Sequence, residues 1–84
     1  MTRIEIRALA QEYGCKVSGK CGRALIDAIE WASIYNPVEW GNMTIICSQI
    51  GTKSYGRIYS AIKPMMGGNP RDKLAYLADM IKLE

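Results

Sequence analysis

The side chains best suited to binding chemistry lie in one stretch of the chain, TIICSQIGTKSYGRIYSAIK, which covers Thr44 to Lys63. Arginine and lysine bind phosphate groups and base edges, and hydroxyl groups hydrogen-bond to both. Three residues near the amino end of a predicted helix would contact phosphate, and they are Lys53, Ser54 and Tyr55. The residues that would face the groove and read base edges follow at helical spacing, and they are Arg57, Tyr59, Ser60 and Lys63. These residue types favour a nucleic-acid ligand.

A first helix must precede this cationic segment. Ile45, Ile46 and Ile50 place apolar side chains one helical turn apart, which predicts a helix with a buried face. Gly51 follows, and glycine adopts a positive φ without steric cost. Thr52 and Ser54 can then cap a new helix.

The second helix is predicted over residues 55–63. Tyr55, Ile58 and Ile62 are three and four residues apart and would face inward. Arg57, Ser60 and Lys63 would point away from that face, with Tyr59 at its edge. A helix, a glycine turn and a helix with a cationic outer surface form the layout of a helix-turn-helix, whose second helix enters the major groove of DNA. The alternative is an ordinary pair of core helices with a solvated polar face.

The spacing after Gly51 departs from that of a standard helix-turn-helix. Apolar residues are expected six and nine positions later, but the apolar pair Ile58 and Ala61 comes one residue late. We therefore expect a turn that is longer by one residue and takes in Lys53. Gly56 supports a late helix start, because glycine costs roughly 1 kcal/mol inside a helix and less near its first turn.

The first part of the chain reads as two further helices. Thr2 and Glu5 form a capping box, and Gly14 stands where a helix ends. Residues 15–22 are expected to form a polar loop, which could touch phosphates through backbone N–H groups. A second helix is predicted from about Gly22 or Arg23 to Tyr35.

The remainder predicts a short helical piece and a last helix. Asn36-Pro37 with Glu39 is a helix-start pattern, and the piece that it begins holds Val38 and Trp40. Met65 and Met66 are expected to fill the core. Gly67-Gly68 is a hinge. Asn69-Pro70 with Asp72 repeats the start pattern, and the apolar stripe of the last helix is Leu74, Leu77, Ala78 and Ile81. The predicted architecture is all-α: residues 1–84 form a single compact domain of five or six helices.

Composition narrows the class of protein. The 84 residues are 49% hydrophobic, as in a globular domain, and no apolar run is long enough to cross a bilayer. The amino-terminal residues carry charges where a signal peptide needs an apolar stretch, so we expect a cytoplasmic protein of bacterial or viral scale with no membrane partner. The net charge is +3, and the cations gather near the first helix and around the proposed turn. This distribution is a weak indication of a nucleic-acid-binding surface. The alternative is that the charges are simply distributed over a solvated surface.

The chemistry of catalysis and metal binding is missing from the sequence. The chain has no histidine and three cysteines, Cys15, Cys21 and Cys47, which offer no fourth ligand for zinc at a usual spacing. We expect three small and mostly buried thiols in a reducing compartment, with a redox role for Cys15 and Cys21 as the alternative. Phosphate-binding loops and nucleophile–base pairs are also lacking, so no enzyme activity and no cofactor is expected.

Several sequence blocks together resemble the C-terminal DNA-binding (effector) domain of the sporulation response regulator family, stage zero sporulation protein A. The blocks are, in order, EYG at Glu12–Gly14, LIDAI at Leu25–Ile29, Tyr35-Asn36 with Glu39, Ile50-Gly51-Thr52, Arg57–Lys63 and Ala78–Glu84. The resemblance implies a six-helix domain with a central helix-turn-helix and a recognition helix at residues 55–63. It also implies a turn one residue longer than that of the family.

The chain departs from the family pattern in three ways. It starts at the effector domain, without the phosphorylated receiver domain, so we expect no control by phosphorylation. Tyr59, Ser60 and Lys63 stand where the family has a glutamate and two arginines that read bases, so the DNA site of the family should not be read unchanged. Residues 51–56 also differ, which could rotate the recognition helix in the groove.

Two functions follow as expectations. The first is a DNA-binding transcriptional regulator that contacts double-stranded DNA, as a homodimer or in tandem. The resemblance places the self-association surface on the last helix, at Leu74, Leu77 and Ile81. The second is a protein-interaction module or phage-encoded modulator that keeps the fold without specific DNA reading.

Overall fold

The structure, a computed structural model, describes residues 2–36, 39–51 and 55–82. Within these residues the chain forms five α-helices and no strand. In chain order they are α1 (Arg3–Glu12), α2 (Gly19–Ile34), α3 (Met43–Ile50), α4 (Tyr55–Ile62) and α5 (Pro70–Lys82). No helix in this part of the chain is long and apolar enough to span a membrane. The all-α prediction is confirmed.

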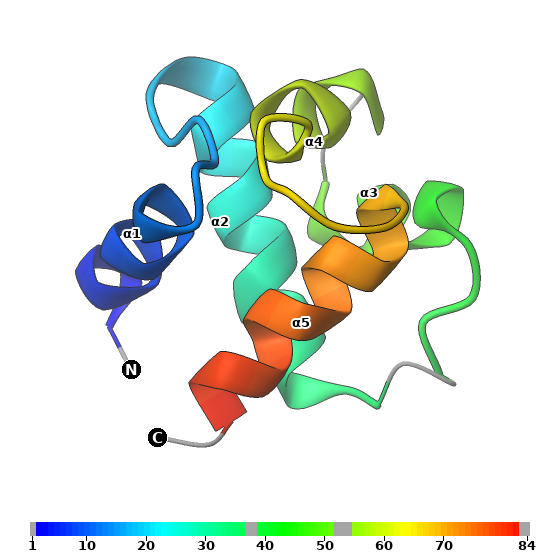
Figure 1. The fold of residues 1–84 in the computed structure, drawn as a ribbon. Helices are drawn as coiled ribbons and strands as arrows, with labels where there is room; N and C mark the ends of the chain where they lie inside the picture. Colours follow the sequence, from blue (N-terminus) through cyan, green and yellow to red (C-terminus); the bar gives the residue numbers. More distant parts are fainter. Residues whose placement is uncertain (1, 37–38, 52–54, 83–84) are drawn as a thin grey trace.

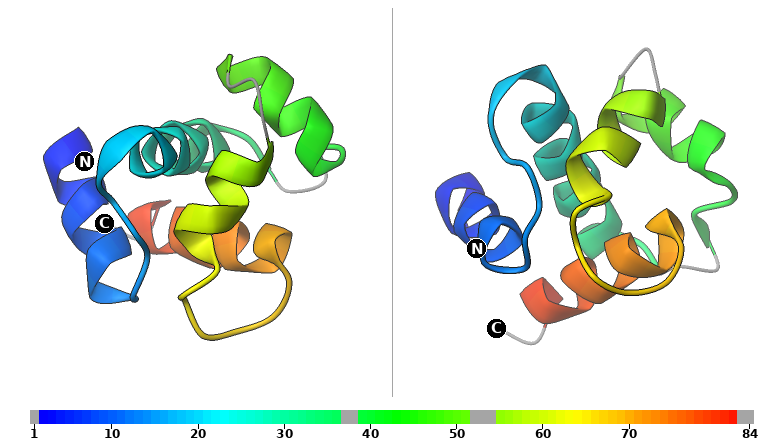
Figure 2. Two further views of the ribbon diagram at one scale, coloured as in Figure 1. Left: turned by 90° about the horizontal axis from the view of Figure 1, so that it is seen from above. Right: turned by 45° about the horizontal axis from the view of Figure 1, so that its top comes forward.

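The longest helix, α2, forms the centre of the fold, and each of the other four helices packs against it. Figures 1 and 2 show α1 and α4 on opposite sides of α2, with α5 crossing below α4 and α3 at the periphery. All large side chains that are fully buried are apolar, and they are Ile6, Leu25, Ile29, Trp40, Ile46, Ile58, Ile62, Leu74 and Leu77. One core therefore holds all five helices together.

Local signals in the sequence explain several helix ends. The predicted capping box is present, with the Thr2 hydroxyl accepting from the Glu5 N–H and the Glu5 carboxylate accepting from the Thr2 N–H. This hydrogen bonding lowers the pKa of Glu5. Asn69 Oδ1 likewise accepts from the Asp72 N–H at 2.9 Å, where α5 begins. Gly51 ends α3 in the left-handed conformation, with φ of 77°.

The boundary of α2 corrects a prediction. The helix begins at Gly19, after Ser18, rather than at Gly22 or Arg23, so the connection from α1 is shorter than the predicted loop of residues 15–22. Gly22 lies inside the helix because the backbone of Val17 packs directly against it: a Cβ added at Gly22 would lie 2.1 Å from the Val17 carbonyl carbon. The glycine serves close packing, and it does not mark a loop.

Two apolar residues are not where the periodicity placed them. Ile45 was predicted to be buried but is 47% exposed, because the inner side of α3 is formed by Ile46 and Cys47. Met66 was predicted to fill the core but is 89% exposed, while its neighbour Met65 is buried. Consecutive side chains in an irregular segment can point in opposite directions, and only one of the two methionines faces the core.

The short helical piece expected after α2 lies partly at residues 37–38, outside the described residues. The flanking residues form a turn: the Asn36 N–H donates to the Glu39 carboxylate at 3.0 Å, and the Glu39 N–H donates to the Asn36 carbonyl at 2.8 Å. This turn delivers Trp40 to the core, where its Nε1 donates to the Tyr35 carbonyl at 3.0 Å.

Candidate nucleic-acid interface

The outer surface of α4 is the candidate site, and the packing of α4 decides which side chains reach it. Ile58, Ala61 and Ile62 are buried against the core. Tyr55 and Arg57 are half-buried at the two edges of the helix. The exposed side between those edges carries Gly56, Tyr59 and Ser60, with Lys63 directly after the helix. The burial of Ile58 and Ile62 and the exposure of Ser60 and Lys63 agree with the predicted periodicity, whereas Arg57 lies at an edge and Tyr59 is exposed, the reverse of the prediction. The bounds of α4 agree with the predicted helix to within one residue.

Three of the predicted site residues form a row that runs from Tyr55, at one edge of α4, to Tyr59 on its exposed side and Lys63 directly after the helix. The rings of Tyr55 and Tyr59 lie 6.0 Å apart between centroids, and the Lys63 ammonium group lies 5.9 Å from the centroid of the Tyr59 ring. Tyr59 as a whole remains 41% exposed. An exposed ring beside a cation presents both a flat apolar surface and a positive charge, which suits the sugar–phosphate backbone and base edges of nucleic acid.

Arg57 lies at the other edge of α4, apart from that row. It lines an open hollow of about 360 Å³ together with Lys20 and Arg23 of α2, and with Asp27 and Gly51. The structure thus brings two cations that were not among the predicted site residues into one hollow with Arg57. Lys20 fell in a predicted loop and Arg23 at a predicted helix end, and no spacing in the sequence connects either of them with Arg57.

The other predicted contacts have different outcomes. Ser60 is exposed near the middle of the outer surface. Lys53 and Ser54, with Thr52, lie outside the described residues, and the extra turn residue predicted at Lys53 lies there too. The proposed phosphate contacts before α4 are therefore represented in the described structure by Tyr55 alone.

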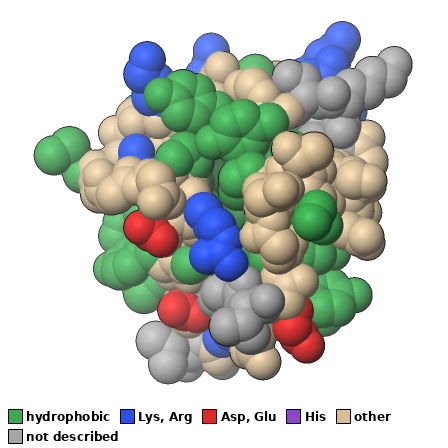
Figure 3. Space-filling view, turned by 90° about the vertical axis from the view of Figure 1, so that its right-hand side faces the viewer, with side chains coloured by type: hydrophobic (Ala, Val, Ile, Leu, Met, Phe, Trp, Pro, Cys, Tyr) green, Lys and Arg blue, Asp and Glu red, His purple; other side chains and the backbone are tan. Residues whose placement is uncertain are grey.

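Figure 3 shows the side of the molecule that lies to the right in Figure 1. Hydrophobic side chains gather in its upper half, with lysine and arginine side chains above them and near the centre of the view. Mixed apolar and cationic character is compatible with either nucleic acid or protein as the ligand.

The predicted self-association residues need a correction. Leu74 and Leu77 are fully buried in the core of a single chain, and Ile81 is half-buried. Apolar periodicity in α5 marks the face that packs against α2 and α4, so Leu74 and Leu77 have no surface to offer a second copy. The exposed side of α5 carries Tyr76 and Asp79 instead.

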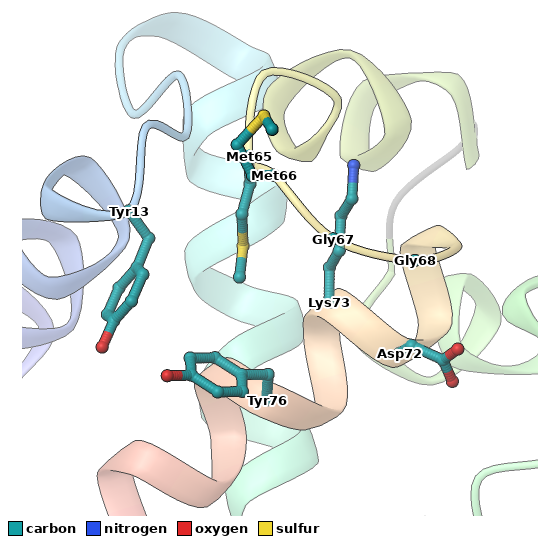
Figure 4. A pocket seen from close by; sticks show the side chains of 8 residues that line it. All are labelled: Tyr13, Met65, Met66, Gly67, Gly68, Asp72, Lys73 and Tyr76. Atoms are coloured by element: carbon teal, nitrogen blue, oxygen red, sulfur yellow. The ribbon is translucent and has the colours of Figure 1, made fainter.

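A second hollow, of about 400 Å³, lies between the end of α1, the segment after α4 and α5. In Figure 4, Tyr13 and Tyr76 lie on one side of it, Lys73 and Asp72 on the other, and the methionine side chains between them. The two tyrosine rings pack edge to face at 5.4 Å, and their hydrogen bond raises the pKa of Tyr13. Lys73 donates to the Lys63 carbonyl at 3.4 Å and so helps to close the end of α4.

The cysteines are free thiols: Cys15 and Cys47 are buried, and Cys21 is half-buried. Burial raises the pKa of Cys15 to about 11, although the Lys73 charge opposes the shift, and burial also raises the pKa of Cys47. The Cys15 sulfur lies 3.9 Å from that of Met65. Among the described residues, no group of three or more histidine, cysteine, aspartate or glutamate side chains could hold a metal ion.

The raised pKa predicts slow alkylation of Cys15 in the folded chain. Because the thiolate is the reactive form, a change in pKa from 9.0 to about 11 lowers the reactive fraction at pH 8 by about 100-fold. Burial slows access further. We expect iodoacetamide to modify Cys15 at least about 100-fold faster in a denaturant than in buffer at pH 8, as followed by peptide mass mapping. Equal rates in the two solutions would contradict the buried position of Cys15.

Comparison of the chain with protein-family models, with curated protein sequences and with solved structures gives no match. The resemblance to the sporulation effector domain thus rests on the sequence blocks alone.

Proposed function

We propose that the protein binds double-stranded DNA and regulates transcription, with α4 as the recognition helix of a helix-turn-helix formed by α3 and α4. The observation that carries the proposal is the outer surface of α4, which presents Tyr59, Ser60 and Lys63 to solvent. The sequence of α4, YGRIYSAI, contains no acidic residue that would repel phosphate. The small residues Gly56 and Ser60 leave room for the helix backbone to approach the floor of a groove.

Within this proposal the contacts differ in kind. Lys63 and Arg57 contact phosphate oxygens and position the helix. Tyr59 and Ser60 face the base edges, where a hydroxyl group accepts or donates and therefore discriminates less sharply than the bidentate fork of an arginine. We infer a modest sequence preference, and a site that differs from the one read by the sporulation family.

Binding to duplex DNA is tested by fluorescence polarisation on a pool of random duplexes, followed by selection of the bound sequences. We expect binding at low salt that weakens steeply as salt rises. Lys63→Ala and Arg57→Ala should each remove about one phosphate contact, which reduces the slope of log K against log salt by about 1.

The matched control for these variants is Lys82→Ala. It removes a cation at the end of α5, which lies at the opposite end of the molecule from α4 (Figure 1). Its salt dependence should remain that of the parent chain. Failure of the parent chain to bind any duplex at low salt would refute the proposal, as would normal binding by both Arg57→Ala and Lys63→Ala.

A second candidate function is a protein-interaction module, and a specific observation favours it. The exposed rings and side chains on α3 and α4 include Ile45 at 47% and Tyr59 at 41%, so part of the surface is apolar. A stoichiometric protein complex without any shift of duplex DNA would support this alternative.

A further inference from the structure

A third open hollow, distinct from the one near Tyr13 and Tyr76, lies beside the hollow that Arg57 lines. It has a volume of about 250 Å³ and lies between α1 and the amino half of α2. Arg3 and Arg7 of α1 line it together with Arg23, and Arg23 also lines the hollow of Arg57. Because Arg23 borders both hollows, cations from α1, α2 and α4 form one continuous band across the amino half of α2.

One of these cations is already neutralised. Arg3 lies 2.7 Å from the carboxylate of Asp27 and 3.5 Å from that of Glu30. The other four, which we call the cation track, are Arg7, Lys20, Arg23 and Arg57. None of the four forms a salt bridge with any residue that the structure describes. Asp27, the acidic residue that lines the hollow of Arg57, is thus paired with Arg3, and the track retains its positive charge.

The exposure of the cation track identifies the kind of anion that fits it. Arg7, Lys20 and Arg23 are exposed and Arg57 is half-buried, so the four side chains lie over an open surface instead of enclosing one small ion. The three helices that carry them lie side by side, with α1 and α4 on opposite sides of α2 (Figure 2). An extended anion with regularly spaced charges matches such a band better than a single phosphate does.

We propose that the cation track binds the sugar–phosphate backbone of the same duplex that α4 contacts, so that the protein covers more of the DNA than its recognition helix alone. This inference rests on the proposed function. The phosphates of one strand follow one another every 3.4 Å along the helix axis, so a band that crosses three helices meets several of them. Contacts of this kind fix position and add affinity but carry no sequence information.

The proposal predicts a distinct signature for loss of the track. The double substitution Arg7→Ala/Arg23→Ala should remove about two phosphate contacts and reduce the slope of log K against log salt by about 1.8. The loss of affinity should be equal for selected and for random duplexes, because the track reads no bases. Circular dichroism confirms that the variant is folded, which is expected because both side chains are exposed.

Lys82→Glu is the matched control, since it lowers the net charge by the same two units without touching the track. It should bind as the parent chain does, apart from a small change common to all duplexes. The experiment also separates the two proposals. If the parent chain binds duplex DNA and the double variant binds it with an unchanged salt slope, the track inference is wrong and the proposed function stands.

Two other results would overturn the inference. If the parent chain binds no duplex, the proposed function and the track fail together. If the parent chain instead binds vesicles of anionic lipid through Arg7 and Arg23, the track recognises a membrane surface and not a nucleic acid.

Discussion

Replacing Trp40 with alanine should lower the free energy of unfolding by about 3–5 kcal/mol, which is the usual range for loss of a buried tryptophan. A domain of this size has a total stability of roughly 4–13 kcal/mol, at about 0.05–0.15 kcal/mol per residue. We therefore expect a variant that is largely unfolded or only marginally folded at 25 °C.

The size of this effect follows from the burial of one side chain and from two of its contacts. Trp40 is fully buried although it lies between two helices and not within one. Its Nε1 donates to the carbonyl of Tyr35, at the end of α2. The guanidinium group of Arg71, from the first turn of α5, lies 5.4 Å from the centroid of its ring. Removing the indole thus opens a cavity and separates α2, α5 and the segment between α2 and α3 together.

Urea denaturation followed by circular dichroism measures the loss. Trp40→Phe keeps an aromatic ring but removes the N–H donor, and it should cost less than alanine, since the Tyr35 carbonyl also accepts from Lys82 at 3.3 Å. Trp31→Ala is the comparison, because Trp31 is only half-buried and its ring lies 4.9 Å, at a tilt of 36°, from that of the exposed Tyr35. A cost below about 1 kcal/mol for Trp40→Ala would contradict the core position of this residue.

Replacing Gly22 with alanine is the second substitution with a large expected effect, and here the usual sign reverses. Alanine is normally more favourable than glycine in a helix interior by about 1 kcal/mol. At Gly22, however, a Cβ would lie 2.1 Å from the carbonyl carbon and 2.3 Å from the carbonyl oxygen of Val17. Because these are backbone atoms, the whole segment before α2 must move. We expect a net loss of about 1–3 kcal/mol or more.

Gly51→Ala provides the comparison for this variant. No heavy atom lies within 4 Å of a Cβ built at Gly51, so only its positive φ of 77° opposes the substitution. That conformation costs a non-glycine residue roughly 1–2 kcal/mol. The thermal unfolding midpoints of the two variants are compared: Gly22→Ala reports the steric clash with Val17, and Gly51→Ala reports the backbone strain of a positive φ. A Gly22→Ala chain as stable as the parent would show that Val17 does not pack closely against α2.

The helices that are marked by several local signals at once could be predicted from the sequence. α1 has a capping box and α5 has the pattern of asparagine, proline and aspartate, and the structure confirms both starts. Gly51 and the stripe of Ile58 and Ile62 were enough to place α4. In each case the signal acts within one or two turns of the helix, so it does not depend on the rest of the fold.

Features that depend on contacts between distant residues could not be predicted. Gly22 is required because the backbone of Val17 packs directly against it. In the sequence, a glycine that follows Lys20 and Cys21 is instead typical of a loop. Ile45 is exposed because α3 lies at the periphery of the fold and only its narrow side with Ile46 and Cys47 is buried. The candidate site was predicted only in its α4 part, because tertiary packing brings Lys20 and Arg23 of α2 beside Arg57.

The start of α1 and the end of α5 both contact the carboxyl half of α2 or the residue directly after it, although Arg3 also lines the hollow of Arg7 and Arg23. Arg3, at the start of α1, pairs with Asp27 and Glu30, and Lys82, at the end of α5, donates to the carbonyl of Tyr35. A linker that joins the end of one copy to the start of another would therefore run between points that both lie near the carboxyl half of α2. Two copies tethered in this way gain effective concentration in the millimolar range for a short flexible linker, so the fold is well suited to binding by avidity.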